Sequence, residues 1–99
     1  MTLFSVLTPV FDPVPEHLAA CLASVARQRG ASVGHVLVDD GSSDPAVLAL
    51  TPGAIRRAEN GGIVAASNDA LAAATGEWVV LLDHDDELAD GALATLAQH

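Results

Sequence analysis

The chain has 99 residues, enough for one small domain that buries about 60–70% of the surface its unfolded chain would expose. Hydrophobic residues make up 51% of the sequence, which excludes an intrinsically disordered chain. Four arginines and no lysine stand against thirteen acidic residues, for a formal net charge of −9. This balance argues against nucleic acid as a partner, because phosphate backbones are bound by clustered basic side chains.

We expect a cytoplasmic protein with no segment of this chain inserted in a membrane. The first residues have no basic region of the kind that begins a signal peptide, and no apolar stretch approaches the roughly 20 residues needed to span a bilayer. Cys21 is the only cysteine, so an internal disulfide is impossible. It lies among Leu18, Leu22 and Val25 in the helical pattern, so we expect it to be buried as a small hydrophobic residue.

Strand and helix patterns alternate from the start of the chain. Leu3–Thr8 is predicted to be a first strand, ended by Pro9. A helix is expected from about Pro15, and Gly30 terminates it. His35–Asp39 is predicted to be a second, buried strand.

The same alternation continues after the turn at Gly41. Asp44 and Pro45 predict the N-cap and the first residue of a short helix. Ala54–Arg57 is a weak third strand, expected at an edge of the sheet. The alanine-rich segment Ile63–Ala74 is predicted to be a helix, closed by Gly76.

A fourth strand, Glu77–Leu82, and a last helix, Ala89–Gln98, complete the chain. The apolar run in the strand is typical of a buried strand. In the helix, Leu93 and Leu96 are expected to point inward. The order βαβαβαβα predicts the α/β class, with a Rossmann-like parallel sheet and right-handed crossovers.

An acidic segment directly follows the fourth strand. Asp83-His84-Asp85-Asp86-Glu87 would emerge at the carboxyl rim of the sheet, where open α/β folds bind ligands. Carboxylates this close repel one another unless a cation or hydrogen-bond donors lie between them. The segment therefore indicates a divalent metal and a phosphate-bearing ligand, although a solvated acidic loop before the next helix is the simpler alternative.

Three strand ends are expected to converge on this rim: Thr8–Asp12, Asp39–Asp44 and Asp83–Glu87. The first loop has no glycine, which excludes the dinucleotide-binding fingerprint, and no P-loop sequence occurs. An EF-hand is excluded because Leu88 occupies the position that needs glycine. The remaining interpretation is a nucleotide site in which Mg²⁺ or Mn²⁺ bridges a diphosphate to aspartates.

Four segments resemble the N-terminal, nucleotide-binding half of family 2 glycosyltransferases, which are inverting enzymes of the GT-A fold. They are similar to the family's Pro-Thr-Tyr-Asn loop, its Val-Asp-Asp-Gly-Ser-x-Asp segment, its Asn-x-Gly…Arg-Asn helix start and its Asp-x-Asp metal motif. In this sequence the segments are Ser5–Asp12, Val38–Asp44, Asn60–Asn68 and Leu82–Asp86, in the family's order. The resemblance implies a truncated GT-A subdomain with sheet order 3-2-1-4, which binds a nucleotide-diphosphate sugar, most readily a UDP-sugar.

The resemblance also implies how the base is bound. Pro9 and Phe11 would border the nucleotide, with Phe11 stacking on the base in place of the family's tyrosine; the alternative is an ordinary core phenylalanine. Asp40 would accept a hydrogen bond from the uracil N3–H, and Asp39 would hold the base or the loop. Each of these aspartates alone could instead form the turn beside Gly41.

Two further aspartates are implied at the metal, Mn²⁺ or Mg²⁺. Asp85 would coordinate it through the diphosphate, and Asp83 would contact the ribose or the metal and its water. Asp86 is either a further ligand or a helix cap, and His84 occupies the variable middle position and is not expected to be a ligand.

The chain also departs from the family pattern. Ser67 replaces a frequent arginine, which leaves diphosphate binding more dependent on the metal. Val10 and Asp12 replace a threonine and an asparagine. No catalytic residue is assigned here, because the resemblance implies a general base beyond residue 99, in an acceptor-binding half.

We therefore interpret residues 1–99 as a single donor-binding domain from a longer enzyme, inactive alone. In the resembled fold further strands follow the fourth, so Trp78–Leu82 would be an apolar edge, and self-association through it is expected. One alternative is a non-catalytic nucleotide-binding, metal-binding or assembly module. A phosphoacceptor receiver domain is less favoured, because its acidic pair would follow the first strand and it would need a lysine.

Overall fold

The computed structural model describes residues 3–98. Its four strands form one parallel sheet in the order β3-β2-β1-β4. The strands are β1 (Leu3–Val10), β2 (Ser32–Asp39), β3 (Ile55–Arg56) and β4 (Trp78–Leu81). The helices are α1 (Pro15–Ala26), α2 (Pro45–Leu50), α3 (Ile63–Ala73) and α4 (Ala92–Ala97). The predicted α/β class, the element order and the strand order 3-2-1-4 are confirmed.

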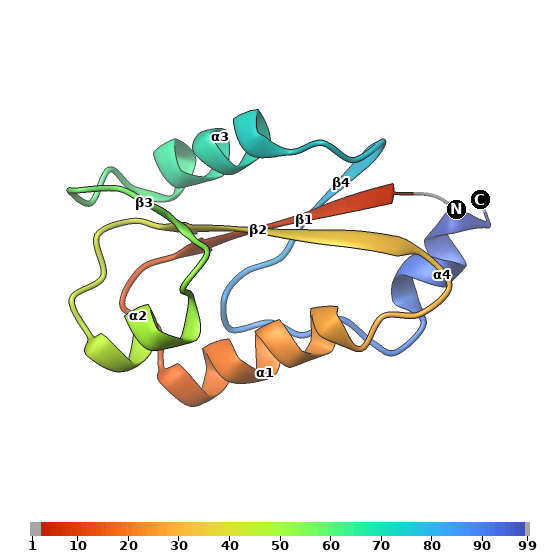
Figure 1. Cartoon of the computed structure of the whole chain (residues 1–99), viewed down its shortest axis with the longest axis horizontal. Coiled ribbons are helices and arrows are strands. Elements are labelled where there is room, and N and C mark those ends of the chain that lie inside the picture. Colours follow the sequence, from red (N-terminus) through yellow and green to blue (C-terminus); the bar gives the residue numbers. More distant parts are fainter. Residues whose placement is uncertain (1–2, 99) are drawn as a thin grey trace.

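The sheet is covered on both faces, with α3 on one side and α1 and α2 on the other (Figure 1). Alternate side chains of β1 point to opposite faces. Phe4 and Val6 pack in a cluster with Cys21 and Leu93 on the α1 side, whereas Leu7 packs in a cluster beneath α3. Because both faces are buried, β1 is almost continuously apolar. The buried position predicted for Cys21 is confirmed.

The sequence predicted that Pro9 ends the first strand, and this was wrong. β1 continues to Val10. On the β2 side, the Asp40 N–H donates a hydrogen bond to the Val10 carbonyl. On the β4 side, the Leu82 N–H donates one to the Leu7 carbonyl. Pro9 is in phase with Leu7 and therefore faces the β4 side, where β4 has already ended. A proline is tolerated there because no partner strand needs its missing N–H.

The fourth strand is not buried, which corrects the first interpretation of its apolar run. Trp78 and Leu81 are 63% and 70% exposed, and only the inward-facing Val80 and Leu82 are covered. Within residues 3–98, β4 pairs with β1 alone and forms one edge of the sheet. The apolar edge implied by the family resemblance is therefore present.

The last helix is shorter than predicted, and only its first turn is covered. It begins at Ala92 after Gly91, so residues 83–91 form an irregular loop rather than a helix start. Leu93 is fully buried as expected, but Leu96 is 53% exposed because it lies in the uncovered last turn. Among the described residues, no helix is long and apolar enough to cross a membrane.

Candidate functional site

A cavity of about 430 Å³ opens at the carboxyl ends of β1 and β4, beside the start of α3. It is lined by Pro9, Val10, Phe11, Asp40, Asn60, Gly62, Ile63, Ala66, Asp83, His84 and Asp85. Five of the six predicted site residues therefore surround one space, and only Asp39 is not among those that line it. Such a volume suits a small-molecule ligand.

Asp40 lies one residue after β2 and is only 2% exposed. Its Oδ1 accepts hydrogen bonds from the Gly61 N–H and the Arg57 Nε–H, and its Oδ2 accepts one from the Gly62 N–H, all at 2.9 Å. The hydrogen bond from Gly61, supported by those from Gly62 and Arg57, holds the pKa of Asp40 below its ordinary value against the opposing effect of burial. Asp40 is thus an ionised acceptor at one wall of the cavity, and its Oδ2 has one acceptor position left.

Asp39 turns away from the cavity and organises the loop after β2. Its Oδ1 accepts from the Ser42 N–H at 3.2 Å, and its Oδ2 pairs with Arg56 at 3.3 Å. Gly41 adopts a φ of +88°, and a Cβ there would lie 3.1 Å from the backbone nitrogen of Asn60. Glycine at this position therefore allows the loop to approach the segment that leads into α3.

The loop after β1 carries Phe11, which is 46% exposed at the cavity. This position contradicts the alternative of a core phenylalanine. The next residue, Asp12, has a φ of 41°, a conformation that aspartate and asparagine tolerate better than other side chains. Its N–H donates to the Ser42 hydroxyl and its Oδ1 accepts from the Ser43 N–H. The loops after β1 and β2 are therefore held together.

The acidic loop brings three carboxylates to one place. Ligand oxygens of Asp83, Asp85 and Asp86 lie within 4.8 Å of one another, and all three side chains are exposed. The Asp86 N–H donates to the Asp83 carbonyl at 3.1 Å, which bends the loop into a turn. Asp86 does not cap α4, whose N-cap is Gly91. Carboxylate oxygens in this number suit a hard cation such as Mg²⁺ or Mn²⁺, so the residues fit the expected metal.

His84 also lines the cavity, and its Nδ1 is buried with no hydrogen-bond partner among the described residues. A buried polar atom of this kind is uncommon in folded proteins.

Two arginines with no role predicted from the sequence organise the site. Arg57 bridges Asp40 and Asp69, and Arg56 pairs with Asp39. The pairs with Asp39 and Asp40 each span 17 residues, so no local pattern could have identified them. None of the arginines in the described chain lines the cavity, which matches the missing arginine at Ser67.

Comparison with known proteins agrees with this architecture. The model of the family described as "Glycosyl transferase family 2" matches residues 5–99. The chain is 35% identical over 96% of its length to the O-antigen biosynthesis protein RfbC of Myxococcus xanthus, and covers 8% of that protein. It is 36% identical over 87% of its length to a PGL/p-HBAD biosynthesis glycosyltransferase of Mycobacterium bovis, and covers 36% of it.

Among solved structures, S. aureus TarS has the same fold, with a TM-score of 0.81 and 29% sequence identity over 96% of this chain. The match covers 31% of the solved TarS fragment 1–349 and 19% of the longer TarS chain. TarS has been solved in complex with UDP and with UDP-GlcNAc. The chain thus spans between 8% and 36% of the lengths of these relatives.

Proposed function

Because the chain belongs to glycosyl transferase family 2, we propose that it binds the donor of an inverting glycosyltransferase, a nucleotide-diphosphate sugar and foremost a UDP-sugar. One observation carries this proposal. The buried, ionised Asp40 and the exposed carboxylates of Asp83 and Asp85 line the same cavity. A donor of this class has a base at one end and, beyond the ribose, a charged diphosphate, and these two walls offer a partner for each.

The base is assigned to the wall formed by the loops after β1 and β2. Asp40 can only accept hydrogen bonds in its ionised form, and it retains one acceptor position on Oδ2. Uracil presents an N3–H donor, whereas cytosine has an unprotonated nitrogen there that would face the carboxylate with its lone pair. Phe11 offers an exposed ring for stacking, Pro9 borders the same space, and Asp39 holds the loop in place.

The diphosphate is assigned to the acidic loop, through Mn²⁺ or Mg²⁺. Asp85 and Asp83 would hold the cation, and Asp86 is close enough to be a third ligand. When bound, the cation offsets negative charge on the departing nucleoside diphosphate. The chain needs this help, because its arginines are engaged with carboxylates and backbone carbonyls.

We assign acceptor binding and the general base to the additional sequence that the longer relatives possess. On this view residues 1–99 are one donor-binding domain and are inactive alone. The base would deprotonate the acceptor hydroxyl as it attacks the anomeric carbon. A cytoplasmic location stays a prediction.

Comparing UDP with CDP tests the assignment of the base, because the two nucleotides have the same size and the same diphosphate. We expect CDP to bind about tenfold more weakly or worse in the presence of Mn²⁺, since a hydrogen bond to a charged group contributes about 1.5–3 kcal/mol. Calorimetric titration of both nucleotides measures this ratio. Equal affinities would show that Asp40 does not read the base.

We also propose that two copies associate through β4. The edge strand exposes Trp78, Val79 and Leu81, carries no charged side chain, and leaves one row of backbone groups unpaired within the described chain. Two such edges can pair with each other around a two-fold axis, which would cover both.

A further inference from the structure

Three side chains in and just after α1 lie on the side that is turned toward the acidic loop. Cys21 and Ser24 belong to α1, and Gln28 follows just after the helix ends, so the spacing of three and four residues places them on one side. Cys21 and Ser24 are fully buried and Gln28 is 6% exposed. Polar groups at such positions are costly unless their hydrogen bonds are made.

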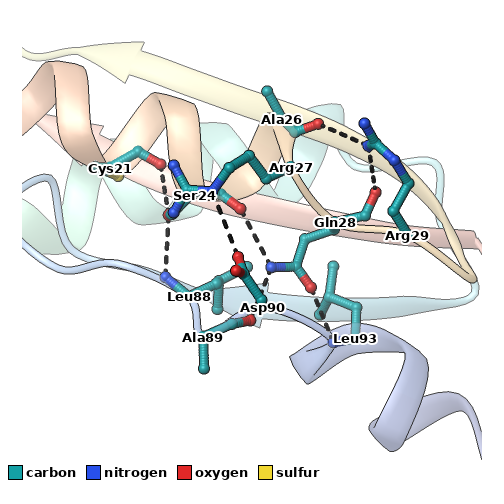
Figure 2. Close-up of polar contacts among 10 residues, drawn as sticks. All are labelled: Cys21, Ser24, Ala26, Arg27, Gln28, Arg29, Leu88, Ala89, Asp90 and Leu93. Carbon is teal, nitrogen blue, oxygen red and sulfur yellow. Dashed lines mark hydrogen bonds and ion pairs between the residues drawn. The ribbon is translucent and has the colours of Figure 1, made fainter.

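All three side chains contact the backbone of the loop that follows β4. The Cys21 Sγ donates to the Asp83 carbonyl at 3.6 Å, within the range for sulfur. The Ser24 hydroxyl accepts from the Leu88 N–H at 3.0 Å while donating to the Cys21 carbonyl at 2.7 Å (Figure 2). The loop is therefore bound at its first residue and again where it leaves the acidic cluster.

Gln28 extends the same line of contacts to the start of α4. Its Nε2 donates to the Ala89 carbonyl at 2.9 Å and to the Ser24 carbonyl at 3.2 Å, and its Oε1 accepts from the Leu93 N–H at 3.1 Å (Figure 2). Loops usually bond their backbone to water at the surface, so a loop bonded at this many points to buried side chains is held unusually firmly.

We propose that Ser24 and Gln28, with Cys21, are positioning residues for the metal: by fixing the backbone on both sides of residues 84–87, they hold the carboxylates of Asp83 and Asp85 ready to bind the cation. This inference rests on the proposed function. The three side chains do not line the cavity and act only through the loop. Their effect is to lower the entropy that the acidic loop would otherwise lose when the metal binds.

Ser24→Ala tests the proposal with little change in volume, because it removes only the hydroxyl that binds the Leu88 N–H. Ser5→Ala is a matched control. The Ser5 hydroxyl is also buried and also accepts from backbone N–H groups, those of Thr75 and Gly76, in a loop at the opposite end of the sheet. The dissociation constant of UDP is measured by calorimetry for both variants and the parent protein, in Mn²⁺ and in EDTA.

We expect Ser24→Ala to weaken UDP binding about tenfold in Mn²⁺, the usual size of effects from groups that orient metal ligands. Ser5→Ala should stay within about twofold of the parent protein, because distant sites act independently. In EDTA none of the three proteins should bind UDP, and urea unfolding of each variant distinguishes a local effect on the loop from a general loss of folding. Unchanged affinity of Ser24→Ala in Mn²⁺ would overturn the proposal.

Amide hydrogen exchange keeps the two proposals separate. If the parent protein shows no Mn²⁺-dependent UDP binding, the proposed function fails, and exchange alone then decides whether the loop is held from α1. We expect faster exchange at Asp86 and Leu88 in Ser24→Ala than in Ser5→Ala. Equal exchange in the two variants would overturn the positioning role.

Discussion

At the scale of single residues, His35 gives the protein a specific sensitivity to pH. Its Nε2 lies 2.7 Å from the Thr8 hydroxyl, and burial lowers its pKa from 6.5 to about 4. Between pH 6.5 and about 4, the unfolded chain therefore binds a proton at His35 that the folded chain does not. The free energy of unfolding falls as the pH drops through this range.

We expect this difference to reduce the free energy of unfolding by up to about 3 kcal/mol, less where solvent screens the partly exposed ring. Urea unfolding at several pH values measures the loss. His35→Gln can keep a hydrogen bond to Thr8 but does not titrate, and it should flatten the curve over that range. The same slope in the variant would assign the loss to other groups.

Interactions between residues close in the sequence were predictable. Hydrogen bonds between residues far apart in the sequence were not. The N-cap role of Asp44 follows from its place before Pro45, and its carboxylate does accept from the Ala46 N–H at 2.9 Å. Asp40 was singled out by the family resemblance together with its position after a strand, but its hydrogen bonds to Arg57 and Gly61 depend on how distant segments fold together.

At the scale of elements, α4 has one fully buried side chain, Leu93. Leu93 is fully buried in the cluster that contains Phe4 and Val6, so Leu93→Ala should lower the free energy of unfolding by about 2–5 kcal/mol. Leu96→Ala on the same helix is the control, and it should change that energy by less than about 0.5 kcal/mol because Leu96 is exposed. Urea unfolding compares the two. Similar losses would mean that the last turn is packed after all.

The sequence predicted which segments are helices and which are strands. The residues at which the strands begin and end depend on pairing within the sheet. The second strand was predicted to begin at His35, yet β2 begins at Ser32 and includes Gly34, a residue type that is depleted in strands. Leu3 and Ser5 of β1 pair with these two residues, and the pairing outweighs their propensity. In the same way, the apolar run of β4 predicted a strand but could not reveal that its outer side is exposed.

At the scale of the whole molecule, two opposing properties govern association. The net charge of −9 opposes association, whereas in our proposal the exposed apolar edge of β4 favours it. We expect dimers in sedimentation velocity at high protein concentration, and more of them as salt screens the repulsion.

Val79→Lys should abolish these dimers by placing a charge on the edge strand. Val64→Lys is the control, since Val64 is also an exposed valine but lies on α3. A protein that stays monomeric at high concentration and high salt would contradict association through β4, as would equal effects of the two variants.

The complete site also belongs to the scale of the whole molecule. The sequence predicted that three strand ends would converge, because the carboxyl ends of parallel strands share one rim. It could not predict that Asp39 would turn toward Arg56, or that α1 would bind the acidic loop through Ser24 and Gln28, because both depend on tertiary contacts.

Metal-dependent binding of UDP tests the central claim most directly. UDP is titrated into the protein by calorimetry with Mn²⁺ and then with EDTA, alongside Asp85→Asn and the control Glu87→Gln, which removes an equal charge from the same loop outside the cavity. We expect binding that requires Mn²⁺, is lost in Asp85→Asn and persists in Glu87→Gln. No binding by the parent protein, or equal binding in Mn²⁺ and EDTA, would contradict a donor site that works through a metal.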